Sequence, residues 1–159
     1  MILAIDPGKS GGFAYVDRYL DVTVEPMPAT EGDIEEEISC AAFSSESDRV
    51  AIIEKVGGYA GAAMPGSRMF AFGENYGFLK GVVMSCGFKL HLVTPQAWQK
   101  ALGLGTSKGL TKTAWKNKLK AEAQRLYPDL KVTLKTADAL LILEWYQRCF
   151  KPMEHEQSK

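Results

Sequence analysis

Three acidic residues that lie far apart in the sequence, Asp6, Glu54 and Asp138, occupy positions where a carboxylate is costly to bury. Asp6 and Glu54 each directly follow a short apolar run, residues 2–5 and 50–53, and a glycine follows each acid within three residues. A carboxylate at the end of a buried strand loses hydration, and this loss is costly unless a cation or a hydrogen-bond donor compensates for it. Either acid alone could cap a helix or pair with a lysine, but the repeated arrangement favours a shared chemical role.

Asp138 lies on the apolar face of a predicted helix. At about 100° per residue, it falls within a stripe of mostly apolar side chains, formed by Leu141, Ile142, Trp145 and Cys149. Alternatively, Asp138 caps the helix, because it comes near the predicted helix start, although Thr136 could serve as the cap itself.

The three acids could converge at one end of a sheet, and clustered carboxylates repel one another unless cations neutralise them. Hard oxygen ligands select Mg²⁺, for which Mn²⁺ is expected to substitute. Two such ions can activate a water and stabilise the leaving oxygen of a phosphodiester during an in-line displacement. The residue types therefore indicate hydrolysis of a nucleic-acid backbone, with two ions in the site.

The elements that must position these acids can be predicted from periodicity and turn signals. We expect strands at residues 2–5, 13–16, 19–24, 50–53 and 89–93, and helices at 31–43, 67–86, 94 onwards, about 108–126 and 136–148. The first three strands read as an antiparallel meander, and strands and helices alternate after it. This order predicts an α/β fold with a mixed five-stranded sheet flanked by helices.

Size and composition limit the class of protein. With 159 residues, 46% of them hydrophobic, the chain can form one domain over residues 1–150, followed by a flexible tail at 151–159. An ATPase of the actin or sugar-kinase type also begins with a strand, an Asp-x-Gly turn and a hairpin, but it needs two such domains. The length therefore disfavours that class.

The cysteines and the N-terminus bear on the compartment. Cys40, Cys86 and Cys149 are odd in number and widely spaced, which argues against a disulfide framework and against a thiolate zinc site. The first apolar run is too short for a signal peptide or a membrane span. We expect a cytoplasmic protein that does not bind membranes.

The segments that carry the three acids resemble the carboxylate motifs of RuvC-type Holliday-junction resolvases: residues 2–8 with Gly11 and Gly12, residues 51–56, and residues 137–142. Helix 67–86 and segment 93–98 are similar to the same family, especially its phage-encoded members, so the resemblance covers nearly the whole chain. It implies a ribonuclease H-like fold, magnesium-dependent cleavage of DNA by Asp6, Glu54 and Asp138, and a homodimer that cuts symmetrically across a four-way junction.

One position departs from the bacterial members of that family, which usually carry a fourth acid or a histidine one helical turn before the last aspartate. Lys135 stands there in this chain. Because lysine cannot ligate magnesium, either the site uses three carboxylates, or Asp129 or Glu144 joins them. Glu144 projects about 120° away from Asp138 on an ideal helix, which disfavours it. Lys135 could instead contact the scissile phosphate, or it could mark reduced activity.

The chain has no net charge, so any surface that binds nucleic acid must come from uneven distribution. Residues 31–48 are rich in acids, whereas 108–125 are basic. We expect the lysines of the basic segment to bind backbone phosphates, unless they only form a solvated helix face: Lys108, Lys112, Lys116, Lys118 and Lys120.

The loop 57–68, which follows Glu54, could reach the centre of a junction through Tyr59 and Arg68, or it could be a plain surface loop. A second possible function is a non-catalytic or weakly active protein of the same fold that binds branched nucleic acid.

Three glycines at intervals of four, Gly73, Gly77 and Gly81, share one face of helix 67–86. Each costs about 1 kcal/mol relative to alanine in a helix, so something is expected to pack very close to that face. The partner is either the sheet or a second copy of the chain.

Overall fold

The computed structural model describes residues 1–43, 48–57 and 65–150. A five-stranded sheet lies at its centre, with the strand order β3-β2-β1-β4-β5. The strands are β1 (Ile2–Asp6), β2 (Gly12–Val16), β3 (Val22–Pro26), β4 (Val50–Glu54) and β5 (Lys89–Val93). The first three form an antiparallel meander, while β4 runs parallel to β1 and β5 parallel to β4.

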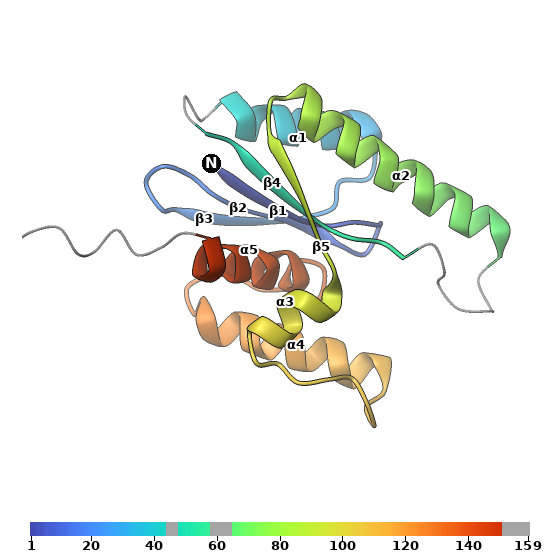
Figure 1. Ribbon diagram of the computed structural model, residues 1–159, viewed down its shortest axis with the longest axis vertical. Helices are drawn as coiled ribbons and strands as arrows, with labels where there is room; N and C mark the ends of the chain where they lie inside the picture. The colour runs from blue at the N-terminus through green and yellow to red at the C-terminus, as the bar shows by residue number, and fades with distance from the viewer. Residues whose placement is uncertain (44–47, 58–64, 151–159) are drawn as a thin grey trace, which may run out of the picture.

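Helices cover both faces of the sheet (Figure 1). One face carries α1 (Glu31–Phe43) and α2 (Gly66–Ser85), and the other carries α3 (Pro95–Ala101), α4 (Lys112–Leu126) and α5 (Ala137–Phe150). The predicted mixed five-stranded sheet flanked by helices is confirmed.

The strands β1 and β4 are apolar at every position before their last because both of their faces are buried. In β1, Leu3 and Ile5 pack towards α1 and α2, whereas Ile2 and Ala4 belong to the core beneath α5. The same alternation holds in β4. These two strands end in Asp6 and Glu54, so the acids close the most deeply buried part of the sheet.

Strand β3 begins at Val22 rather than at residue 19. The backbone N–H groups of Tyr19 and Asp21 donate to the Asp17 carboxylate at 2.8 and 3.0 Å, and Leu20 has a φ of 69°. This side-chain-capped turn takes up the residues that were assigned to the strand.

Helix α4 begins at Lys112 rather than near residue 108. Thr111 is its N-cap, with the hydroxyl oxygen accepting the N–H of Ala114 at 3.1 Å. Gly109, just before the cap, has a φ of 79°, a conformation that does not continue a helix.

One of the two alternatives for the glycines of α2, close packing onto the sheet, is wrong. A Cβ built at Gly73, Gly77 or Gly81 meets no atom of the described residues within 4 Å. Helix α2 packs inward through other residues, Leu79, Val82 and Val83. The glycine face points to solvent together with Phe70 and Met84, which are 69% and 56% exposed.

Two further predictions concern the rest of the chain. Within the described residues, no helix has the length and apolar character that crossing a membrane requires. The predicted flexible tail, 151–159, lies outside the described residues.

Candidate active site

The sheet register places Asp6 and Glu54 side by side. Ile5 lies opposite Ile53 in the parallel pair β1 and β4, so the next residue of each strand emerges at the same edge of the sheet. Asp6 is 8% exposed and Glu54 is partly buried. Both acids lie at strand ends, as expected, and the parallel register brings these ends close together.

The glycine turn after Asp6 leaves room for the chain to fold back and for α5 to approach. Gly8 has a φ of 105°. A Cβ at Gly11 would lie 2.0 Å from the Asp6 carbonyl oxygen, and one at Gly12 would lie 2.9 Å from the carbonyl oxygen of Lys135. The segment leading into α5 passes directly beside the end of β1 and the start of β2, and this close approach requires glycine there.

Asp138, in the first turn of α5, is 4% exposed. Its Oδ2 forms an ion pair with Lys116, and its Oδ1 is buried without a hydrogen-bond partner among the described residues. Just before α5, Thr133 and Thr136 bond to each other reciprocally: the Thr133 hydroxyl accepts the backbone N–H of Thr136 at 3.3 Å, and the Thr136 hydroxyl accepts that of Thr133 at 3.0 Å. Asp138 is the second residue of α5, and its Oδ2 pairs with Lys116, so the alternative that it caps the helix is wrong.

The electrostatics show that the three acids face one another. Burial, reinforced by the charges of Asp138 and Glu54 and opposed by Lys116, raises the pKa of Asp6 to about 8. Burial also raises the pKa of Glu54, and Asp138 adds to this effect. The three carboxyl groups therefore do not all ionise at neutral pH unless further positive charge joins Lys116.

Trp98 holds Glu54 in place. The indole Nε1–H, on a side chain that is fully buried, donates to Glu54 Oε2 at 2.8 Å and opposes the rise in the pKa of Glu54. Helix α3 presents Trp98 there because Thr94 caps the helix and Pro95 is its first residue. The role of Trp98 was missed, although a buried indole N–H always requires an acceptor.

Replacing Trp98 by Phe should weaken divalent-metal binding about tenfold, the scale of losing a group that orients a metal ligand. The Glu54 pKa should rise without the indole hydrogen bond, so metal binding should move to higher pH. Calorimetric titration with Mn²⁺ at several pH values measures both. Trp115→Phe removes the same volume from the same core and is the matched control. An identical pH dependence in both variants would mean that Trp98 only fills space.

Lys116 is the residue whose position differs most from expectation. It was assigned to phosphate binding, but its ammonium forms the ion pair with Asp138. Although burial alone would lower it, the charges of Asp138, Asp6 and Glu54 raise the pKa of Lys116. The lysine therefore belongs to the carboxylate cluster, which a list of charges along a helix could not reveal.

The cluster fits a hard divalent cation by its chemistry. It offers carboxylate oxygens from Asp6, Glu54 and Asp138, including the Oδ1 that has no partner among the described residues, and Lys116 does not offset the effect of burial, which raises the pKa of Asp6 and Glu54. As the side chains stand, however, no group of three His, Cys, Asp or Glu residues within the described ranges converges closely enough to hold a metal ion. Metal binding would require the carboxylates to turn towards a common point.

The other predicted DNA-binding residues differ in exposure and in the contacts that they make. Lys108, Lys112, Lys135 and Arg68 are exposed, and Lys120 is partly buried. Lys118 donates to the Leu104 carbonyl at 2.8 Å and lies over the ring of Trp115, so it braces the loop before α4. Tyr59 lies outside the described residues.

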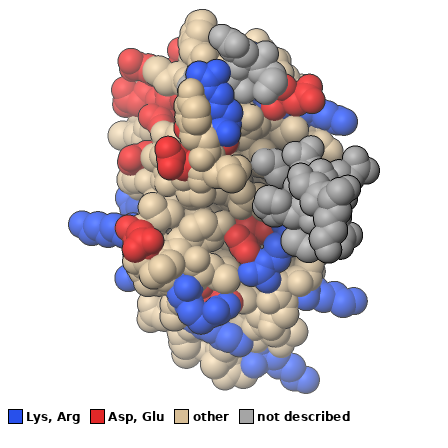
Figure 2. All heavy atoms as spheres, turned by 90° about the vertical axis from the view of Figure 1, so that its left-hand side faces the viewer, with Lys and Arg blue, Asp and Glu red and all other residues tan. Residues whose placement is uncertain are grey.

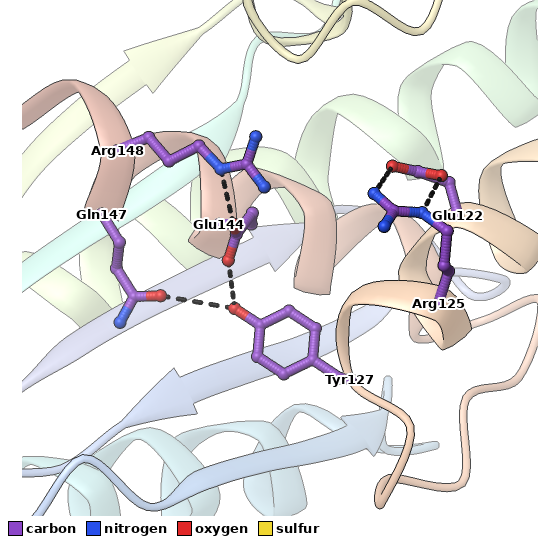
Figure 3. Close-up of polar contacts among 6 residues, drawn as sticks. All are labelled: Glu122, Arg125, Tyr127, Glu144, Gln147 and Arg148. Atoms are coloured by element: carbon purple, nitrogen blue, oxygen red, sulfur yellow. Dashed lines mark hydrogen bonds and ion pairs between the residues drawn. The ribbon is translucent and has the colours of Figure 1, made fainter.

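The two alternative acids do not join the cluster. Glu144 accepts hydrogen bonds from the Tyr127 hydroxyl at 2.6 Å and from Arg148 at 2.6 Å (Figure 3). Asp129 is exposed in the turn after α4. The Tyr127 bond ties the end of α4 to α5, and a separate pair, Glu122 with Arg125, lies within α4.

Charge is distributed unevenly over the surface. In Figure 2, Asp and Glu gather at the upper left, towards the side of α1, and Lys and Arg predominate in the lower half, towards the α3 to α5 layer. The carboxylate cluster faces that basic layer through Lys116 and Asp138. The expected separation of charge is therefore present on the face that Figure 2 shows.

No protein-family model matches the sequence, and no curated protein matches it. Among solved structures, Thermus thermophilus RuvC in complex with a Holliday junction substrate is similar, with a TM-score of 0.58 and 15% identity over 92% of this chain and 94% of that chain. A second Thermus thermophilus RuvC structure has a TM-score of 0.53 and 16% identity over 92% and 95%. At this identity the likeness concerns the fold, and the predicted ribonuclease H-like fold is confirmed.

Proposed function

We propose that this chain is a metal-dependent endonuclease that resolves Holliday junctions or other branched DNA. The observation that carries the proposal is the buried cluster of Asp6, Glu54 and Asp138 at one edge of the sheet of a ribonuclease H-like fold. The similar RuvC structure that contains a Holliday junction supports branched DNA as the substrate class.

In this proposal Asp6, Glu54 and Asp138 hold Mg²⁺, or Mn²⁺ in its place, with two ions per site. Such ions supply activation of a water and stabilisation of the leaving oxygen of a phosphodiester. Trp98 keeps the Glu54 carboxylate oriented, and burial of Asp6 and Asp138 excludes bulk water from their oxygens. Each acid contributes charge that a metal can neutralise, which explains why the fold tolerates three of them together.

The exposed basic side chains are proposed to hold the DNA backbone. Phosphate contacts position a nucleic acid without reading its sequence, which suits an enzyme that recognises a branched shape. We assign this role to the side chains already predicted for it that face solvent: Lys108, Lys112, Lys135 and Arg68, with Lys118 and Lys120. Tyr59 remains a proposed contact as well.

We also propose that the protein is a homodimer, because two symmetric cuts call for two related sites. Helix α2 offers a surface for it. Its three glycines leave open space between Phe70 and Met84, which are both exposed on the same side of the helix. A second copy can approach closely there.

Substituting Glu for Gly77 should weaken dimerisation at least about tenfold, because it places a charged side chain in the contact. Gly77→Ala adds only a methyl group, into open space, and is the matched control. Analytical ultracentrifugation over a range of concentrations measures the dissociation constants. A wild-type protein that stays monomeric would refute the dimer, and an unchanged Gly77→Glu dimer would place the interface elsewhere.

Cleavage assays test the function directly. With Mg²⁺ present, four-way junctions should be cut faster than three-way junctions, flaps, RNA–DNA hybrids and linear duplexes. Equal rates on all substrates would refute selectivity for branched DNA. Tight junction binding without cleavage in Mg²⁺ or Mn²⁺ would instead support the second candidate, a binding protein of the same fold, which the engaged Lys116 also favours.

A further inference from the structure

Lys116 occupies the carboxylate cluster as an internal cation. Its ammonium bonds to Asp138, and the charges of Asp6 and Glu54 also act on it. The Asp138 side chain is 6% exposed and that of Lys116 is 35% exposed, so the pair lies at the boundary between the core and solvent. The lysine can therefore reach water without unfolding its helix.

The packing of α4 fixes the starting point of the Lys116 side chain. Trp115 and Leu119, on either side of it in sequence, are buried in the core shared with α5. At the end of α4, Tyr127 bonds to Glu144 of α5 (Figure 3). The backbone of Lys116 is thus held beside Asp138, while its flexible stem leaves the ammonium free to move.

One lysine neutralises this cluster incompletely. It bonds to one oxygen of Asp138 and leaves the other, Oδ1, buried without a partner among the described residues. A divalent ion bound by the same carboxylates would repel the ammonium at close range, because both carry positive charge in a poorly hydrated place. Lysine and metal therefore compete for Asp138.

We propose that Lys116 is an exchangeable counter-ion, which pairs with Asp138 in the metal-free protein and leaves it when a divalent metal binds. This inference rests on the metal site of the proposed function. The freed ammonium then lies at the rim of the site, where it can meet a DNA phosphate. The ion pair with Lys116 keeps the three acids together in the absence of metal, and it weakens metal binding until the lysine has left.

Competition has a measurable size. If the lysine-paired state makes up roughly 90% of the metal-free protein, the apparent metal affinity is reduced about tenfold. Lys116→Gln should consequently bind Mn²⁺ about tenfold more tightly than wild type in calorimetric titrations without DNA. Lys112→Gln removes the same charge from an exposed position on the same helix and should change the affinity less than about twofold.

The reactivity of the Lys116 amine reports the exchange in the wild-type protein. Acylation by a water-soluble ester, followed residue by residue with mass spectrometry, should be slow at Lys116 without metal and several-fold faster with saturating Mg²⁺. Lys112 should react at the same rate in both conditions. This measurement does not depend on whether the Lys116→Gln variant folds.

Three results would overturn the proposal: an unchanged metal affinity in Lys116→Gln, Lys116 reactivity that does not respond to Mg²⁺, or an absence of divalent-metal binding in both proteins. None of these measurements contains DNA. A protein that exchanges Lys116 for metal but cuts no branched DNA would support the inference and refute the endonuclease function. A protein that cuts branched DNA without exchanging Lys116 would refute the inference and support the function.

Discussion

Asp6→Asn, Glu54→Gln and Asp138→Asn should each lower cleavage of a four-way junction at least about 1,000-fold, which corresponds to about 4 kcal/mol of lost transition-state stabilisation. Each change removes one charged metal ligand and preserves the shape of the side chain. Gel assays of single-turnover cleavage in Mg²⁺ measure the rates. A variant that cuts at the wild-type rate would remove its residue from the site.

The same three variants should bind junction DNA as tightly as wild type, or more tightly. They lose negative charge close to the proposed DNA path and keep every lysine that attracts phosphate. Filter or gel binding in Ca²⁺ or EDTA separates this effect from cleavage. A parallel loss of binding and cleavage would indicate damage to the fold rather than to the metal site.

Asp6 offers an internal check on folding. Because burial and the neighbouring acids raise its pKa to about 8 in the folded protein, Asp6 retains its proton where the unfolded chain has lost it. The stability it contributes is full below about pH 4 and is lost as pH rises towards 8, by about 1.4 kcal/mol per pH unit. Denaturation of the metal-free protein should show this slope, and Asp6→Asn should lack it.

The positions of the three acids could be predicted because strand ends and helix faces are local features of a sequence. Asp6 and Glu54 followed from apolar runs that stop at glycine, and the parallel register of β1 and β4 then places them together. Asp138 followed from a helical stripe. The sequence also indicated the alternation of elements, so the sheet and its two helical layers were expected.

The direction in which a helix face or a side chain points could not be predicted from the sequence. The basic character of α4 was evident, but it did not show that Lys116 points inward while Lys112 is exposed. The glycines of α2 were interpreted as a packing surface, either for the sheet or for a second copy of the chain, and they face away from the sheet. Periodicity identifies a distinct face of a helix, and only the tertiary packing decides what that face meets.

Lys135 stands one helical turn before Asp138, and its backbone lies beside Gly12 at the end of the sheet. Its side chain is exposed. Two accounts of this residue make opposite predictions for Lys135→Asp. If the site lacks a fourth ligand, the added carboxylate should tighten Mg²⁺ binding and shift cleavage to lower metal concentration. If Lys135 contacts the scissile phosphate, the same change should slow cleavage.

We expect the phosphate role. Lysine binds phosphate readily, and the exposed Lys135 stands one helical turn before Asp138, where it can meet a phosphate held at the site. Lys135→Ala and Lys135→Asp should both lower the rate about 100-fold at saturating Mg²⁺, the scale of removing one group that stabilises transition-state charge. Lys131→Ala, at an exposed position four residues earlier, should cleave as wild type does. A Mg²⁺ titration of cleavage distinguishes the accounts: a lower midpoint in Lys135→Asp would favour the missing ligand, and an unchanged rate and midpoint would leave Lys135 as a solvated residue before α5.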